Sequence, residues 1–356
     1  MIVGKIFGEK ILTFKDRDQR SVTDGYDAVS RPNTHTSAFN RFKDKSGQRL
    51  PAIQPSDYKD NPLPLTTLLN TTPMDQRIIN LYDEYTHLPL SRQEFLRRLV
   101  LLTGSTAAAL AVLPMIEVNQ AHAAVTKSDD LFTEYIKYPG VNGEMQAYVA
   151  RPKAEGKYPA VVVIHENRGL NAHIEDVTRR AANAGFLAIA PNALAPLGGT
   201  PANEDEARIK FQQLKAEDSL QNFIRVFDYL PTRKDTNGKF GCVGFCWGGA
   251  MANNLAVNVP SLKAAVAFYG RQPEAADVAK IKAAVQLHYG ALDERVNAGI
   301  PAYEEALRKN NIPYEIYIYE GANHAFHNDT APARYNETAA KLAWKRTVDF
   351  FGKYLK

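Results

Sequence analysis

The sequence GKFGCVGFCWGGAMANNLA, residues 238–256, is the best guide to how this chain folds. The apolar run Lys239–Phe245 predicts a buried strand, and the residues after the glycine pair predict a helix. Between them lies a G-F-C-W-G turn with Cys246 at its centre. Gly244 and Gly248 have no Cβ, so strand and helix can approach closely. Three roles are open for Cys246: an attacking thiolate, a redox or metal-binding cysteine, or a buried thiol.

The order strand, G-x-nucleophile-x-G, helix is typical of the nucleophile elbow of α/β-hydrolases, where a serine is usual. A helix that begins just after Cys246 lowers the cost of negative charge on its sulfur. Outside the turn, strands alternate with helices over residues 130–356. This alternation predicts an α/β fold with a mostly parallel twisted sheet covered by helices on both faces. One long helix is expected over Glu204–Leu230, ended by Pro231.

Two further residues complete a predicted triad. In this fold the nucleophile is followed along the chain by an acid and then a histidine. Asp293 follows the predicted strand AVQLHYG and His324 follows YEIYIYEG, at the strand ends where α/β sheets place their sites. His324 would take the thiol proton and return it to the leaving group, while Asp293 fixes the imidazole tautomer. His327 is the alternative base, although we interpret it as a surface or supporting histidine, and Cys242 as a small buried side chain.

The loop after the apolar run AVVVIHE is expected to complete the site. The backbone N–H groups of Asn167 and Trp247 are predicted to form the oxyanion hole. Glu166 lies at the end of a buried strand, and we assign it an active-site role, with a helix-capping carboxylate as the alternative. Trp247 and Tyr269 suggest an apolar or aromatic pocket for the acyl group.

At this point the sequence resembles the dienelactone hydrolase (carboxymethylenebutenolidase) family over about residues 130–356. The resemblance rests on HENRGL, GFCWGG, ALDERV and GANHAFH. It implies a single α/β-hydrolase domain that acts as a monomer and needs no metal. It also implies that Cys246, Asp293 and His324 are the triad. Glu166 matches the family's glutamate, which contacts the resting thiol and helps to generate the thiolate when substrate binds.

The chain departs from the family where the substrate carboxylate is held. The family uses two arginines, one in the loop that here reads NALAPLGGT and one four residues after the catalytic histidine, where this chain has Asn328. Arg168, Arg271 and Arg295 are candidate substitutes, and surface salt bridges are their alternative role. We therefore expect a small-molecule ester or lactone as the substrate, while dienelactone itself is in question.

The N-terminal part has a different composition. Residues 1–90 are polar and turn-rich, which predicts a mostly disordered extension. Residues 91–124 combine arginines, an apolar core and an A-x-A site, as in a secretory signal peptide. The prediction is an exported, periplasmic protein without a stable membrane span in the mature form; if the signal does not work, the protein is cytoplasmic. The alternative is an amphipathic helix packed on the domain. We expect translation to start at Met74, which would leave residues 1–73 untranslated.

Composition narrows the function classes. The net charge of the 356 residues is +4 without a block of Lys and Arg, so no nucleic-acid partner is predicted. The two cysteines cannot build a disulfide framework, and their spacing does not match C-x-x-C. No dinucleotide-binding fingerprint or P-loop is present, so no cofactor is predicted, and no metal. An envelope thiol-redox protein and a non-catalytic binding module on a hydrolase scaffold are the alternatives to a hydrolase.

Overall fold

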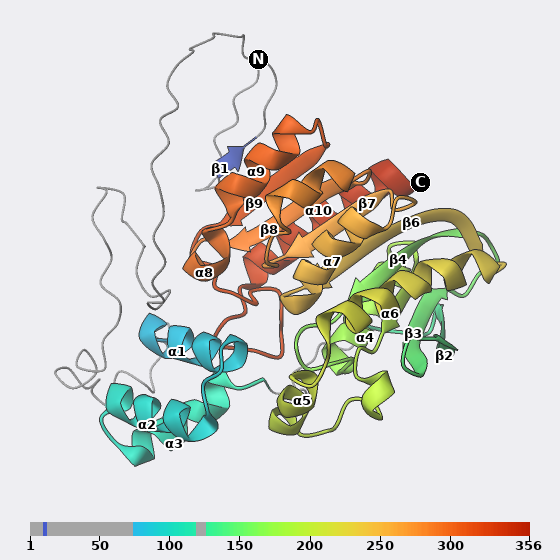
Figure 1. Ribbon diagram of the computed structural model, residues 1–356. Coiled ribbons are helices and arrows are strands. Elements are labelled where there is room, and N and C mark those ends of the chain that lie inside the picture. The colour runs from blue at the N-terminus through green and yellow to red at the C-terminus, as the bar shows by residue number, and fades with distance from the viewer. Residues whose placement is uncertain (1–9, 13–73, 119–125) are drawn as a thin grey trace, which may run out of the picture. The chain divides into compact units, whose positions relative to one another are not determined.

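The computed structural model describes residues 10–12, 74–118 and 126–356 (Figure 1). The chain divides into two compact units, Thr13–Val112 and the remainder, which is Met1–Leu12 with Leu113–Lys356. Most of the extension over residues 1–90 lies outside the described residues, so its predicted disorder stays a prediction.

The larger unit is built on a sheet of nine strands in the order β1-β9-β8-β7-β6-β4-β5-β3-β2. Strands β5, β4, β6, β7, β8 and β9 are parallel to their neighbours in that series, while β1, β2 and β3 pair antiparallel. The predicted, mostly parallel sheet is confirmed. The strands are β1 (Lys10–Leu12), β2 (Leu131–Pro139), β3 (Glu144–Pro152), β4 (Tyr158–Ile164), β5 (Leu187–Pro191), β6 (Thr236–Phe245), β7 (Ala264–Phe268), β8 (Ala284–Gly290) and β9 (Tyr314–Tyr319).

Helices cover both faces of this sheet. Side chains of α4 and α10 belong to one buried apolar cluster, and side chains of α6, α7 and α9 belong to a second. The predicted two-layer covering is therefore confirmed. The helices of this unit are α4 (Ala172–Asn183), α5 (Glu204–Phe211), α6 (Ala216–Tyr229), α7 (Trp247–Asn258), α8 (Glu294–Asn297), α9 (Ile300–Lys309) and α10 (Glu337–Leu355).

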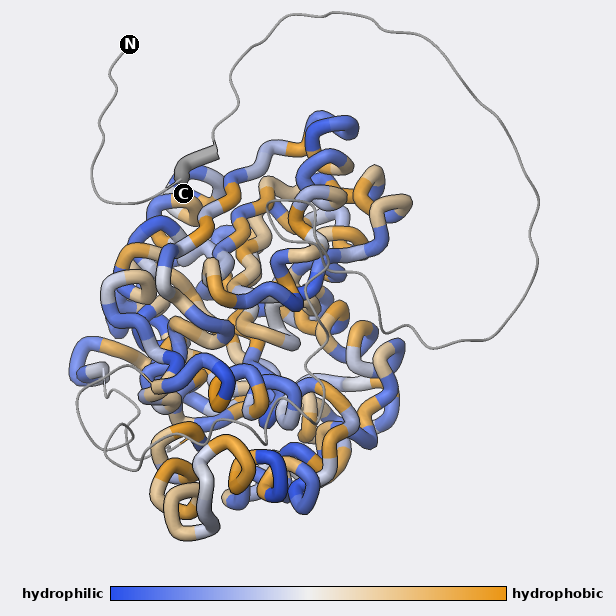
Figure 2. The backbone as a smooth tube through the Cα atoms, turned by 90° about the vertical axis from the view of Figure 1, so that its left-hand side faces the viewer, coloured by the Kyte–Doolittle hydropathy of each residue, from blue (hydrophilic) through white to orange (hydrophobic). Residues whose placement is uncertain are grey.

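The unbroken apolar run in β4 follows from its place in the middle of the sheet. Successive side chains of a strand point to opposite faces. Val161 and Val163 pack in the cluster of α4 and α10, whereas Val162 and Ile164 pack in the other. Because both faces are covered, every position of the strand is apolar. In the helices, by contrast, apolar and hydrophilic residues alternate along the chain (Figure 2).

The predicted single helix over Glu204–Leu230 is wrong. The structure has two helices, α5 and α6, with a break after Phe211. Phe211 and Phe223 both pack against Trp247, with ring centroids 4.9 and 5.8 Å away. On one straight helix these two phenylalanines would lie about 18 Å apart along the axis and could not both contact one ring. The break allows both contacts.

The smaller unit contains a helical pair that the sequence did not predict. Helix α1 (Gln76–His87) packs on α2 (Arg92–Thr103). The rings of Tyr85 and Phe95 stack at 4.5 Å, and Arg98 donates to Glu84 at 2.9 Å. These contacts join the two helices.

The segment over residues 91–124 contains α2 and then α3 (Thr106–Ile116). Among the described residues, no single helix is long and apolar enough to cross a membrane; the bent pair α2–α3 is, by length and composition only. Residues 119–125, which include the A-x-A site, lie outside the described residues. Export stays a prediction.

Candidate active site

Cys246 occupies a strained turn between β6 and α7. Its backbone has φ 56° and ψ −112°, a conformation that L-residues avoid. A Cβ on Gly244 would lie 1.8 Å from the carbonyl oxygen of Gly248, and a Cβ on Gly248 would lie 2.3 Å from that of Ile164. The turn therefore requires both glycines, as the sequence predicted. The Cys246 side chain is held in a largely buried place, with the residue 7% exposed.

Backbone strain is concentrated around this turn. Four non-glycine residues in the described part of the chain have positive φ, and three of them are Cys246, Tyr269 and Ala325. Tyr269 directly follows β7, which is next to β6 in the sheet, and Ala325 directly follows His324. Such conformations cost about 1–3 kcal/mol each and occur mainly at functional sites. Their clustering at neighbouring strand ends is independent evidence for a site.

Asp293 and His324 meet although 31 residues separate them. Asp293 follows β8 and caps α8, where its Oδ1 accepts from the N–H of Val296 at 3.3 Å. Its Oδ2 lies 2.5 Å from Nδ1 of His324, and both residues are buried. Because a carboxylate only accepts, Nδ1 carries the proton and Nε2 presents its lone pair.

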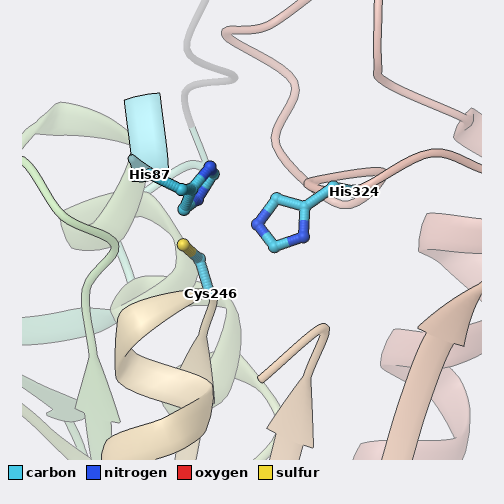
Figure 3. Close-up of side chains that lie close together, drawn as sticks. All are labelled: His87, Cys246 and His324. Carbon is cyan, nitrogen blue, oxygen red and sulfur yellow. The ribbon is translucent and has the colours of Figure 1, made fainter. Parts of the chain in front are cut away.

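The thiol of Cys246 lies on the same side as that lone pair. Its Sγ is within 4.8 Å of a ring nitrogen of His324. The ring of His324 turns its Nε2 edge toward the side on which the sulfur lies (Figure 3). Contacts of this kind often tighten only when substrate is bound. The structure thus brings together the sulfur, imidazole and carboxylate that the sequence singled out.

Glu166 is held by two neutral donors. Its Oε2 accepts from Nδ2 of Asn328 at 2.7 Å, and its Oε1 accepts from the hydroxyl of Tyr269 at 3.3 Å. Burial, followed by the charges of Glu166 and Cys246, raises the pKa of Tyr269 well above its usual value. The Tyr269 hydroxyl therefore lies within electrostatic range of both groups. Tyr269 is almost fully buried. Its observed role is that of a hydrogen-bond donor to Glu166 and not of an exposed wall of the predicted acyl pocket.

The predicted oxyanion loop is fixed by a buried histidine that the sequence analysis missed. Nδ1 of His165 donates to the carbonyl of Glu166 at 2.6 Å, and its Nε2 accepts from the N–H of Ala193 at 3.0 Å. Burial lowers the pKa of His165 to about 4, so its ring is neutral. The ring also stacks on Trp247 at 5.5 Å. His165 thereby connects the loop of Asn167 with the first residue of α7.

The three candidate arginines lie in different surroundings. Arg168 is buried, pairs with Glu204 at 3.3 Å, and donates to the side chain of Asn167 at 2.8 Å. It therefore supports the predicted oxyanion loop. Arg271 and Arg295 are exposed, so neither shares the buried surroundings of Arg168.

The other cysteine and histidine are both buried. Cys242 lies in the cluster of α6 and α7, and burial raises the pKa of its thiol. Its interpretation as a buried side chain is confirmed. His327 is 1% exposed and stacks on Phe245 at 4.9 Å. Of its two predicted positions, the surface one is therefore wrong, and the supporting one stays a prediction. Burial, more than any neighbouring charge, holds its pKa well below the ordinary value.

Comparisons with known proteins place the chain in a family. The model of the dienelactone hydrolase family matches residues 145–355. A provisionally named carboxymethylenebutenolidase of Methylorubrum extorquens is 32% identical over 279 residues, which cover 72% of this chain and 93% of that protein. Another, of a Synechocystis species, is 32% identical over 245 residues and covers 64% of this chain and 99% of its own. The crystal structure of a provisionally named dienelactone hydrolase of Klebsiella pneumoniae aligns with a TM-score of 0.57 at 31% identity, covering 63% of this chain and 99% of that one.

Proposed function

Because the chain belongs to the dienelactone hydrolase family and is a hydrolase of ester or lactone bonds, we propose that its attacking group is the thiolate of Cys246. The observation that carries this proposal is the arrangement of three side chains. The sulfur lies within 4.8 Å of a ring nitrogen of His324, whose other ring nitrogen is bound to Asp293 at 2.5 Å. A thiol needs such a base because little of it is ionised at neutral pH.

The first half of the proposed reaction forms a thioester. The proton of the Cys246 thiol passes to Nε2 of His324, and the sulfur attacks the carbonyl carbon of the substrate. The electron pair of the carbonyl moves to its oxygen, which the N–H groups of Asn167 and Trp247 stabilise. When the carbonyl reforms, the bond to the leaving oxygen breaks, and His324 gives that oxygen the proton.

The second half restores the enzyme. Water gives a proton to His324 as its oxygen attacks the thioester carbon. The carbon–sulfur bond then breaks, the acid is released, and Cys246 regains its proton from His324. Throughout, Asp293 holds the ring in one tautomer and stabilises the imidazolium.

We assign Glu166 to the resting state of the thiol. Its carboxyl group accepts from the Tyr269 hydroxyl at 3.3 Å, and Cys246 acts on the same hydroxyl through its charge. Two negative charges at close range are unfavourable, so an ionised Glu166 keeps the sulfur protonated until the substrate carbonyl is in place. This role protects the cysteine from oxidation, because the thiolate is the form that reacts.

The test compares the two cysteines. Cys246→Ala should abolish hydrolysis of p-nitrophenyl acetate, whereas Cys242→Ala should keep it, because Cys242 is buried on the other side of the sheet. Mass spectrometry of acid-quenched wild-type enzyme should find the acetyl group on the peptide that contains Cys246. Full activity of Cys246→Ala would contradict the proposal.

The alternatives have less support. A thiol-redox protein needs two cysteines that can pair, but Cys242 and Cys246 form no disulfide with each other and belong to different apolar clusters. A non-catalytic module does not explain the strain at Cys246 or the Asp293–His324 contact. Monomeric state, the absence of a metal, and export remain predictions from the sequence.

A further inference from the structure

Three consecutive residues in the loop after His324 form a network in which the middle one anchors the loop and the other two hold a carboxylate. They are Asn328, Asp329 and Thr330. Sequence comparison marked Asn328 only as a departure, in the place of an arginine. The structure gives each of the three a distinct set of contacts. Asn328 bonds to Glu166, Thr330 bonds to Asn328, and Asp329 bonds to side chains of helix α4.

Asn328 is locked in one orientation. Its Oδ1 accepts from both the N–H and the hydroxyl of Thr330, at 3.0 and 2.6 Å. Its Nδ2 is then left to donate to Oε2 of Glu166 at 2.7 Å. Turning the amide over would place oxygen against carboxylate and N–H against N–H, so this orientation is fixed by the network. Both Asn328 and Thr330 are fully buried.

Asp329 ties the same loop to helix α4. Its carboxylate contacts Nδ1 of His173 at 2.8 Å and the guanidinium of Arg180 at 2.5 Å. Arg180 is held in turn by Asp176 at 2.7 Å. Burial raises the pKa of Asp329, but the hydrogen bonds and charges of His173 and Arg180 outweigh burial and hold the pKa well below its usual value. The residue between Asn328 and Thr330 is therefore a charged anchor.

We propose that Asn328, oriented by Thr330 and anchored through Asp329, is a positioning residue that fixes the ionised Glu166 near Cys246 and thereby keeps the resting sulfur protonated. The inference rests on the proposed function, because it names Asn328 as the residue that holds Glu166 in its proposed role. The amide is suited to this task because it is neutral. It orients the carboxylate without cancelling its negative charge, as an arginine would.

Other titratable or charged groups lie around the sulfur. His324 faces it within 4.8 Å and is bound to Asp293. The hydroxyl of Tyr269 donates to Glu166, and the ring of Tyr269 lies 5.0 Å from that of His324. The buried Arg334 acts on Tyr269 through its charge. None of these groups bonds to Thr330 in the described structure, so a change at Thr330 acts on Glu166 through Asn328.

The test measures the pH at which the Cys246 thiol ionises. Iodoacetamide alkylation of the full chain is followed from pH 5 to 10 by mass spectrometry of the Cys246 peptide. Glu166→Gln removes the negative charge and should lower the midpoint by about one pH unit. Thr330→Val keeps the shape but loses the hydroxyl, and it should lower the midpoint by about half a unit. Thr330→Ser keeps the hydroxyl and should match the wild type.

A second variant and a second measurement distinguish a change in thiol ionisation from a loss of folded protein. Asn328→Leu has a similar volume and no donor, and it should shift the midpoint in the same direction as Thr330→Val. The acid limb of kcat/KM for p-nitrophenyl acetate should move with the alkylation midpoint. A variant that is only less stable loses rate at every pH without moving either midpoint.

Two results would overturn the inference. One is an alkylation midpoint of Thr330→Val and Asn328→Leu equal to that of the wild type, while Glu166→Gln shifts it. The other is an unchanged midpoint in Glu166→Gln itself. Failure of the proposed function looks different, because the wild type would then hydrolyse no ester although the alkylation midpoints still follow Glu166.

Discussion

Gly248→Ala tests how closely the first turn of α7 approaches the end of β4. The added Cβ would lie 2.3 Å from the carbonyl oxygen of Ile164 and 2.5 Å from that of His165. Both are backbone atoms, so no side-chain rotation can relieve the contact. The first turn of α7 and the end of β4 must move apart instead.

The size of this movement sets the expected effect. Ordinary contact begins near 3.4 Å, so the backbones must separate by about 1 Å. Overpacking of this kind costs roughly 1–3 kcal/mol of stability. The movement also displaces the N–H of Asn167 relative to that of Trp247. A misplacement of about 1 Å, or the loss of one oxyanion donor, lowers kcat by roughly 100-fold or more.

The assay is urea unfolding together with kcat for p-nitrophenyl acetate. The matched control is Gly352→Ala in α10, where an added Cβ meets nothing within 4 Å. The control should keep its activity and gain up to roughly 0.5–1 kcal/mol, because alanine favours a helix over glycine. If Gly248→Ala matched this control in both stability and kcat, the close approach of elbow and oxyanion loop would be refuted.

Two further predictions concern buried hydrogen bonds. Asp293→Asn should lower kcat by about 10²–10⁴ with little change in urea stability, because asparagine also caps a helix but no longer fixes the tautomer of His324; a loss of less than tenfold would contradict the assignment. His165, which has a pKa of about 4 in the fold and about 6.5 when unfolded, binds more protons in the unfolded state between these values. The free energy of unfolding is therefore highest, as far as this residue is concerned, above pH 6.5, where the ring is neutral in both states. Up to about 3 kcal/mol of it is lost as the pH falls toward 4. Urea unfolding should show a smaller loss for His165→Gln; parallel pH curves for variant and wild type would exclude this contribution.

The fold could be predicted because its determinants are local. The apolar runs of β4 to β9 and the glycines at 244 and 248 are visible within a few residues. The break between α5 and α6 was not predictable, because its cause is the contact of Phe211 and Phe223 with Trp247, a residue in another element. Strand β1 was missed because a three-residue strand shows no period, and its partner β9 lies about 300 residues away.

In the candidate site, too, features set by local sequence were predicted, and features set by contacts between distant residues were not. Order along the chain was enough to pair Asp293 with His324, since both follow parallel strands. It was not enough to find the role of Asn328, whose partner Glu166 is 162 residues away in the sequence. An asparagine has many uses, and no neighbouring residue indicates which of them applies. Its significance follows only from the three donors and acceptors that surround it in the fold.

The strain at the site links stability with chemistry. Cys246, Tyr269 and Ala325 together cost roughly 3–9 kcal/mol if each positive φ costs its usual amount, which is comparable with the whole net stability of a domain. Relaxing Cys246 would require breaking the bond from its N–H to the carbonyl of Phe268 and opening the junction of β6 and α7. The apolar strands on either side hold that junction from both faces. The same packing that makes the sheet stable therefore keeps Cys246 in a conformation that a free chain would abandon, with its sulfur within 4.8 Å of a ring nitrogen of His324.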